Sequence, residues 1–199
     1  MTECNAREFD FQALGSREVA ARFDGGAITS DAGGLLLREV EVKAGIIRRF
    51  AACFHDHRDP ERVEHSVGDL LAQRIFALAL GYEDLNDHDA LRLDPLLAVL
   101  VGKADPTGQD RRRSKDRGKA LAGKSTLNRL ELTPVGADAK SRYKKVVANT
   151  RDIEAFFVET FLALHSAPPK EIVLDFDATD DPIHGAQLGR FFLGYYGGY

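Results

Sequence analysis

The sequence predicts an α+β chain, with a mostly helical N-terminal region that extends to about residue 169 and strands after it. Apolar side chains recur at helical spacing through most of that region. After Ala167-Pro168-Pro169 the pattern changes to a short apolar run that ends in acidic residues. Hydrophobic residues make up 44% of the 199 residues, which is enough to form a core. We therefore divide the chain into a helical region with a short N-terminal strand (1–102), a basic loop with helices (103–169) and the start of an α/β domain (170–199).

The first elements are a polar arm and a short strand within 9–23, which the turn signal Asp24-Gly25-Gly26 ends. Ser30-Asp31 has the residue types of a helix start, and the apolar residues of 35–42 follow it. Residues 46–54 continue this helical pattern.

The next helix is predicted from Asp59-Pro60, a cap followed by proline at the first helical position. Its apolar residues recur from Val63 to Leu78, and Gly81 ends it. Asp94-Pro95 starts another short helix, through Leu100.

The segment 102–118 is polar and contains three consecutive arginines, so we predict a mobile basic loop. Helices are predicted over 119–132 and over 140–165. A buried strand is predicted over 170–177 and a second strand over 191–199. Two strands alone are marginal in water, so we expect the chain to end inside a sheet.

Charge is distributed unevenly along the chain. The overall net charge is −4, but residues 103–151 contain 14 Lys and Arg against five Asp and Glu. A segment this basic is a candidate nucleic-acid contact, although a solvated basic loop would have the same composition. Two cysteines without a CxxC pair make a disulfide framework or a cysteine zinc site improbable. Neither a membrane span nor a signal peptide is predicted, so a cytoplasmic location is expected.

Asp175 and Asp177 are the candidate metal ligands. Residues i and i+2 of a strand point to the same face, so the two carboxylates would project together. Carboxylate oxygens of this kind hold Mg²⁺, and two such metals can bracket a phosphoryl displacement. The alternative is that one aspartate caps the turn while the other is solvated.

Several motifs, in order along the chain, resemble those of the DDE group 1 family of transposases from bacterial insertion sequences. They are ITSDAGGL at 28–35, GYEDLNDHD at 81–89, LAGKSTLNRLE at 121–131, DATDDPIHGAQ at 177–187 and FFLGYYG at 191–197. The resemblance is to the N-terminal part of such proteins, of the insertion-sequence 1380 type.

The resemblance implies a ribonuclease-H-like catalytic domain, here incomplete, that cleaves DNA and transfers strands. Two Asp and one Glu in such enzymes bind two Mg²⁺ or Mn²⁺ ions. Asp177 matches the first acid and Asp175 is the second choice. The other acids would lie beyond this chain, which alone is expected to be inactive. Its implied partners are double-stranded DNA, as terminal inverted repeats and target, and a second copy on the DNA, in the cytoplasm at the nucleoid.

Residues expected to contact DNA phosphates belong to the basic segment. They are Arg111, Arg112, Arg113, Lys115, Arg117, Lys119, Lys124, Arg129, Lys144 and Lys145. A fragment that binds DNA without cutting it is the alternative function.

Residues 118–125 match the phosphate-loop pattern GxxxxGK[ST]. A phosphate loop must follow a buried strand and open a helix, but the basic residues of 111–117 cannot form such a strand. The intervening residues also favour helix. A P-loop ATPase is therefore the less favoured alternative, which a helical course over 118–125 would exclude.

The histidines of His55-Asp56-His57 and Asp87-His88-Asp89 are capable of binding metal. Their short spacing at predicted helix ends fits caps and surface turns better. His184 could approach the active site or have a turn role, and neither alternative is favoured. Tyr195, Tyr196 and Tyr199 could stack on bases, although aromatic residues in a strand more often pack.

Overall fold

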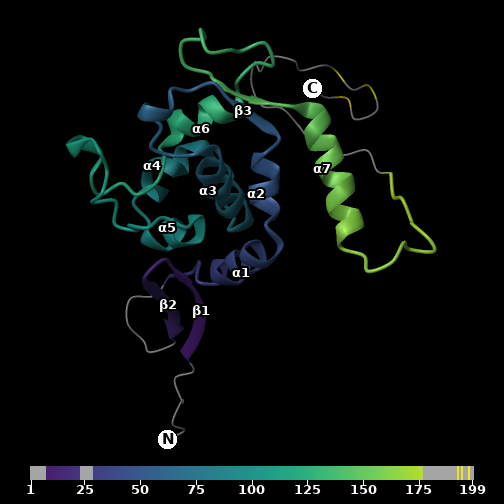
Figure 1. Ribbon diagram of the computed structural model, residues 1–199, viewed down its shortest axis with the longest axis horizontal. Coiled ribbons are helices and arrows are strands. Elements are labelled where there is room, and N and C mark those ends of the chain that lie inside the picture. Colours follow the sequence, from purple (N-terminus) through teal and green to yellow (C-terminus); the bar gives the residue numbers. More distant parts are fainter. Residues whose placement is uncertain (1–7, 23–28, 177–191, 193, 195–196, 198–199) are drawn as a thin grey trace, which may run out of the picture. The chain divides into compact units, whose positions relative to one another are not determined.

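The computed structural model describes residues 8–22, 29–176, 192, 194 and 197. Within them it contains seven α-helices and two small antiparallel sheets, consistent with the predicted α+β class (Figure 1). The chain forms two units, residues 1–163 and residues 164–199, which are described separately below.

The chain begins with a β-hairpin of β1 (Glu8–Leu14) and β2 (Arg17–Arg22), where one strand was predicted. Gly15 is the first of the two turn residues and has φ of 61°, a conformation that glycine adopts without steric cost. The sequence analysis placed its turn after residue 23 and missed this one. Arg38, almost fully buried, donates a hydrogen bond of 3.0 Å to the carbonyl of Gln12, so the hairpin is attached to the first helix.

The predicted helices after Ser30-Asp31 are confirmed as α1 (Gly34–Ala44) and α2 (Ile46–Ala51). Gly45 separates them with a left-handed φ of 62°, and the polypeptide turns there. Gly34 packs against Leu100, since a Cβ at position 34 would lie 2.6 Å from a methyl group of that side chain.

Asp59 caps a short 3₁₀ turn, η1 (Pro60–Arg62), and the main helix begins later than predicted, as α3 (Val67–Ala79). Ser66 and Asp69 form a reciprocal capping box that fixes this start. After η2 (Leu85–Asp87) and α4 (His88–Leu91), α5 (Pro95–Val101) begins at the Asp94 cap, as predicted.

The helix predicted over 119–132 is confirmed only as α6 (Lys124–Glu131), after η3 (Ser114–Asp116). Residues 119–123 are not helical. Ala120, Leu121 and Ala122 are buried, and the backbone there bonds to other segments: Leu121 N–H donates to the carbonyl of Arg92 at 3.2 Å. Tertiary packing therefore overrides the helix propensity of these residues.

The helix predicted over 140–165 is wrong in its first ten residues. Strand β4 (Val146–Ala148) pairs antiparallel with β3 (Phe54–Asp56), and α7 (Thr150–Ala163) follows. Val146 and Val147 are buried β-branched residues, which favour strand, and their partner strand is far away in the sequence.

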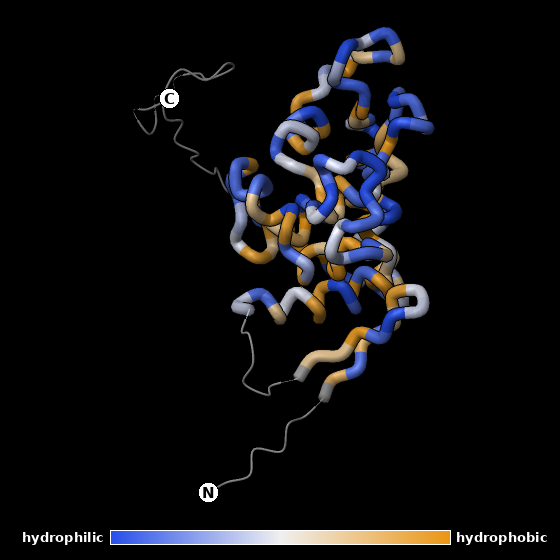
Figure 2. Tube along the Cα trace, turned by 90° about the vertical axis from the view of Figure 1, so that its left-hand side faces the viewer, coloured by the Kyte–Doolittle hydropathy of each residue, from blue (hydrophilic) through white to orange (hydrophobic). Residues whose placement is uncertain are grey.

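The core lies where α1, α2, α5 and α6 surround α3 (Figure 1). Figure 2 shows apolar stretches gathered inside this body and polar ones on its outer loops. The main large residues of the core are Leu35, Ile47, Leu70, Leu71, Phe76, Leu97, Leu100, Leu121, Leu127, Leu130 and Val146.

In the second unit, the described part of the strand predicted over 170–177 is not a strand. Residues 171–176 have no regular structure and are exposed; Val173 is 84% exposed and Phe176 is 89% exposed. A strand needs hydrogen bonds to a neighbouring strand, and no pairing partner for 171–176 lies among the described residues. Asp177, the polar connection after it and most of the second predicted strand lie outside the described residues.

Candidate nucleic-acid interface

A basic hollow of about 880 Å³ lies between the segment 58–65, α6 and the loops on either side of α6. Ten basic residues line it: Arg58, Arg62, Arg92, Arg111, Arg112, Arg113, Lys119, Arg129, Arg142 and Lys145. Four acidic residues line it as well: Asp59, Glu64, Asp89 and Asp116. The excess of cations makes this hollow the candidate site for a polyanion.

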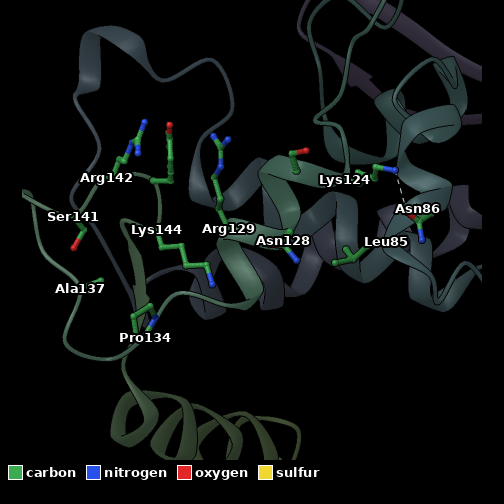
Figure 3. Close-up of a pocket in the computed structure, with 12 residues that line it drawn as sticks. Leu85, Asn86, Lys124, Asn128, Arg129, Pro134, Ala137, Ser141, Arg142 and Lys144 are labelled. Atoms are coloured by element: carbon green, nitrogen blue, oxygen red, sulfur yellow. Dashed lines mark hydrogen bonds between the residues drawn. The ribbon is translucent and has the colours of Figure 1, made fainter. Parts of the chain in front are cut away.

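The hollow brings together most of the sequence-predicted DNA contacts. Arg111, Arg112, Arg113, Lys119, Arg129 and Lys145 line it. Lys124 and Lys144 line an adjoining hollow of about 900 Å³, shown in Figure 3. Lys115 and Arg117 are exposed on the loop that contains Arg111, Arg112 and Arg113, but they line neither hollow.

Arg111 points inward and holds the loop to the body. Its Nη2 donates to Glu64 Oε2 at 2.7 Å, and its Nη1 contacts Nε2 of the buried His65. Burial, together with the nearby Lys103 and Arg111 cations, lowers the pKa of His65 to about 3. His65 is therefore neutral near pH 7, and its Nε2 can accept the guanidinium hydrogen bond.

The rest of the loop before α6 is also tied down. Lys103 Nζ pairs with Asp69 at 2.7 Å, and Arg112 donates to the carbonyl of Glu61. The Asp105 carboxylate accepts hydrogen bonds from the Thr107 side chain and from several backbone N–H groups, which lowers the pKa of Asp105 to about 2. The segment predicted to be mobile is thus fastened at several points.

The phosphate-loop match over 118–125 is connected to other segments of the chain through its backbone N–H groups. A helix over the whole of 118–125 would have excluded the ATPase, but residues 118–123 are not helical, so this ground does not apply. Four of its backbone N–H groups, however, already donate within the chain. Gly118 donates to Gly108, Lys119 to Asp116, Leu121 to Arg92 and Ala122 to the Gln73 side chain. A nucleotide site needs those groups free, so the structure contradicts the ATPase interpretation on this different ground.

Lys124, the lysine of that match, is held by neighbours as well. Its Nζ lies 3.2 Å from Asp89 Oδ2 and 3.1 Å from Asn86 Oδ1. Hydrogen bonds from Lys124, first of all from its side chain, lower the pKa of Asp89. A carboxylate of the chain itself therefore stands beside the start of α6, where a phosphate would otherwise bind.

Arg129 and Arg142 line both hollows. Their guanidinium carbons lie 5.1 Å and 4.8 Å from the ring centroid of Tyr143. Figure 3 shows the two guanidinium groups pointing the same way, one from α6 and one from the loop before β4. The sequence analysis missed Arg142 and Tyr143, although an aromatic residue within the basic run of 142–145 was a usable signal.

No metal centre is formed by the described residues, where no three His, Cys, Asp or Glu side chains come together. Asp175 is exposed in an irregular segment, and Asp177 lies outside the described part. His55 and His57 are exposed, as expected of surface residues. His88 is fully buried, so a surface turn is the wrong interpretation for it.

None of the helices in the described ranges is long and apolar enough to cross a membrane.

Comparison with known proteins relates the chain to a protein family. No curated protein and no solved structure is similar enough to the chain to match it. The model of the family described as "Transposase DDE domain group 1" matches residues 11–199, which is nearly the whole chain. The match begins within β1 and covers the rest of the hairpin, the helical body, the basic hollow and the segment that contains Asp175 and Asp177. The chain therefore belongs to the transposase DDE domain group 1 family.

Proposed function

We propose that this protein binds double-stranded DNA in the basic hollow and acts in the transposition of an insertion sequence, of the 1380 type, by metal-dependent cleavage and strand transfer. The observation that carries the DNA-binding part is the lining of the hollow, with ten basic residues against four acidic ones. Its DNA partners would be the terminal inverted repeats and the target, engaged by two copies of the protein.

The distribution of ion pairs within the hollow supports a phosphate-binding role. Three of its ten cations, Arg58, Arg62 and Arg111, have carboxylate partners in the described structure. The other seven have none there, although several donate to backbone carbonyls. Cations without an internal counter-charge are the ones that can neutralise phosphates and release counterions.

We propose that Asp177 is the first carboxylate ligand of the catalytic metal and that Asp175 is the second choice for this role. The metal ion would be Mg²⁺ or Mn²⁺. Support comes from the family and from the motif over 177–187. The described residues supply only Asp175, which by itself is too few ligands for either ion. We therefore derive no reaction step from the described geometry. The ribonuclease-H-like fold of this second unit is part of the same proposal.

A salt titration tests the DNA-binding part. Fluorescence anisotropy of a labelled duplex of arbitrary sequence is measured at a series of KCl concentrations. The logarithm of the affinity should fall linearly with the logarithm of the salt concentration, with a slope of about −3 or steeper, as for three or more phosphate contacts. Absence of binding at low salt, or binding that salt does not weaken, would contradict the proposal.

A non-catalytic DNA-binding protein is the second candidate, since the described residues contain a basic surface but no metal site. Both candidates predict the same salt dependence. They differ in the cleavage of DNA that carries the element's ends, which only the transposase should cut when Mg²⁺ or Mn²⁺ is added.

A further inference from the structure

We infer that Arg129, Tyr143 and Arg142 form a phosphate clamp, in which one aromatic ring holds two guanidinium groups against neighbouring phosphates of one DNA strand. This inference rests on the DNA-binding function proposed above and names the contact within it. It also assigns Arg111 a different role from the one predicted from the sequence: holding the loop rather than DNA.

The first observation is that both arginines of the clamp have unused donors. Neither Arg129 nor Arg142 forms an ion pair or a side-chain hydrogen bond in the described structure, and both are exposed. Arg111, by contrast, has both terminal nitrogens engaged, by Glu64 and His65, and its Nε is buried. Each guanidinium has five N–H donors in a planar fork that matches phosphate oxygens, so the exposed donors of Arg129 and Arg142 are available to a phosphate that enters the hollow.

The second observation is the position of the ring. Tyr143 is 55% exposed, and both guanidinium carbons lie within 5.1 Å of its centroid. A cation–π contact uses the face of the ring, while the N–H groups at the edge of the guanidinium plane stay free for an acceptor. The ring thus limits the rotamers of two long side chains and keeps their like charges close together. Such a concentration of charge is favourable only when an anion joins it.

The third observation is that the clamp has firm attachment points on both sides. Arg129 lies on α6 between Leu127 and Leu130, which are buried in the core. Tyr143 precedes the buried Val146 of β4 by three residues, and β4 is hydrogen bonded to β3. Both halves are therefore held by packed elements, so little ordering entropy is lost when DNA binds.

The two guanidinium groups point the same way (Figure 3), and their distances to a common ring keep them within about 10 Å of each other. Phosphates of one strand recur at an axial rise of about 3.4 Å per nucleotide, so two guanidinium groups no more than about 10 Å apart can reach nearby phosphates of the same strand. Contacts of this kind fix the position of the duplex without selecting its sequence.

The experiment compares charge-matched double variants in the salt titration described above. Arg129→Ala/Arg142→Ala should flatten the log–log salt slope by roughly two units and weaken binding about tenfold or more at moderate salt. The control Arg48→Ala/Arg151→Ala removes the same charge from exposed positions outside both hollows and should change the slope by less than about half a unit. Circular dichroism and thermal melting should show that all variants are folded.

Two single variants separate the ring from the charges. Tyr143→Phe keeps the ring and should bind duplex DNA as the unaltered protein does. Tyr143→Leu keeps every charge but releases the guanidinium groups, and should flatten the slope by about one unit. A uniform weakening with an unchanged slope would show a merely structural role for Tyr143 and overturn the clamp.

The outcomes distinguish this inference from the proposed function. If the unaltered protein does not bind duplex DNA, the proposed function fails and the clamp fails with it. If that protein binds and Arg129→Ala/Arg142→Ala behaves like the control, the clamp alone is wrong. If Tyr143→Leu weakens binding only to single-stranded DNA, the ring stacks on bases instead, which also overturns the phosphate role.

Discussion

Gln73 and His88 form a hydrogen bond of 2.9 Å between two fully buried side chains, from the amide Nε2 to the imidazole Nδ1. The Gln73 amide also accepts from Ala122 N–H at 2.9 Å and donates to the Ala122 carbonyl at 2.8 Å. Since Ala122 N–H fixes which amide atom is oxygen, the Nδ1 of His88 must be the acceptor. Its proton is then on Nε2, a buried atom without a partner in the described structure. This node, the hydrogen-bonded group of Gln73, His88 and Ala122, connects α3 and α4 to the segment that leads into α6.

Gln73→Leu should lower the free energy of unfolding by about 2–4 kcal/mol, because it leaves buried polar atoms of Ala122 and His88 without partners. Urea unfolding followed by circular dichroism measures the change. Gln109→Leu, at an exposed position, serves as the control and should cost less than about 0.5 kcal/mol. Equal costs for the two variants would show that the node does not stabilise the fold.

Stability should fall as the pH is lowered below about 6.5. Burial lowers the pKa of both His65 and His88, and that of His65 reaches about 3. Above the ordinary histidine value of 6.5, neither the folded nor the unfolded chain is protonated at these sites. Below pH 6.5 these histidines bind protons in the unfolded chain but not in the folded chain. Each of them therefore lowers the free energy of unfolding by at most about 1.4 kcal/mol per pH unit, until the pH reaches its pKa in the folded chain.

Urea unfolding between about pH 7.5 and pH 5 tests this dependence above the range where most carboxylates titrate. His65→Asn should reduce the slope of stability against pH. His57→Gln, at an exposed position, should leave that slope as it is in the unaltered protein. A slope that His65→Asn does not alter would mean that this side chain is protonated in the folded state as readily as in the unfolded one.

Local signals in the sequence predicted those elements that depend on neighbouring residues. The Asp94-Pro95 cap starts α5 as predicted. Gly45, which separates α1 from α2 in the left-handed conformation, was not predicted as a helix end. The larger errors fall where distant segments decide. Residues 119–123 are not helical because their backbone forms hydrogen bonds with Arg92 and Gln73. Residues 146–148 form a strand because they pair with a strand about ninety positions earlier.

The candidate site shows the same division. The density of charge over 103–151 correctly indicated where cations gather. It could not indicate that Arg111 is used internally by Glu64, or that Arg142 shares a ring with Arg129. Pairings of this kind depend on side chains that the fold brings together from far apart in the chain.

Gly108→Ala should destabilise the protein by about 1–3 kcal/mol, as measured by urea unfolding. Gly108 has φ of 67°, and a Cβ there would lie 2.5 Å from the backbone nitrogen of Ala120. Gly15→Ala is a matched control, since Gly15 has φ of 61° but open space around the added atom. Both variants incur the backbone strain, so only the excess for Gly108 reports the packing of the loop against residues 119–120. Equal losses would show that this contact relaxes freely.

Lys124→Ala should leave ATP binding unchanged, because none is expected. Four of the backbone N–H groups over 118–122 already donate within the chain, and Asp89 pairs with Lys124. Isothermal titration calorimetry with ATP and Mg²⁺ checks this for the unaltered protein and the variant. Micromolar binding that Lys124→Ala abolishes would reinstate the nucleotide site.

The last prediction concerns the proposed carboxylates. Asp177→Asn should abolish metal-dependent cleavage of DNA that carries the element's ends, while duplex binding in the salt titration stays unchanged. Asparagine keeps the shape of aspartate but removes the charge that Mg²⁺ or Mn²⁺ requires. Cleavage is measured on gels, and binding is measured by anisotropy on the same preparations.

Asp175→Asn and Asp181→Asn provide the comparison, since each removes one carboxylate close to Asp177 in the sequence. If Asp177 is the first metal ligand, Asp181→Asn should cut normally, and Asp175→Asn should cut more slowly with a raised Mn²⁺ requirement. Cleavage that survives Asp177→Asn but not Asp175→Asn would exchange the two assignments. Cleavage that survives both substitutions would mean that neither carboxylate binds the metal, whereas loss of DNA binding in Asp177→Asn would point to a structural role for that residue.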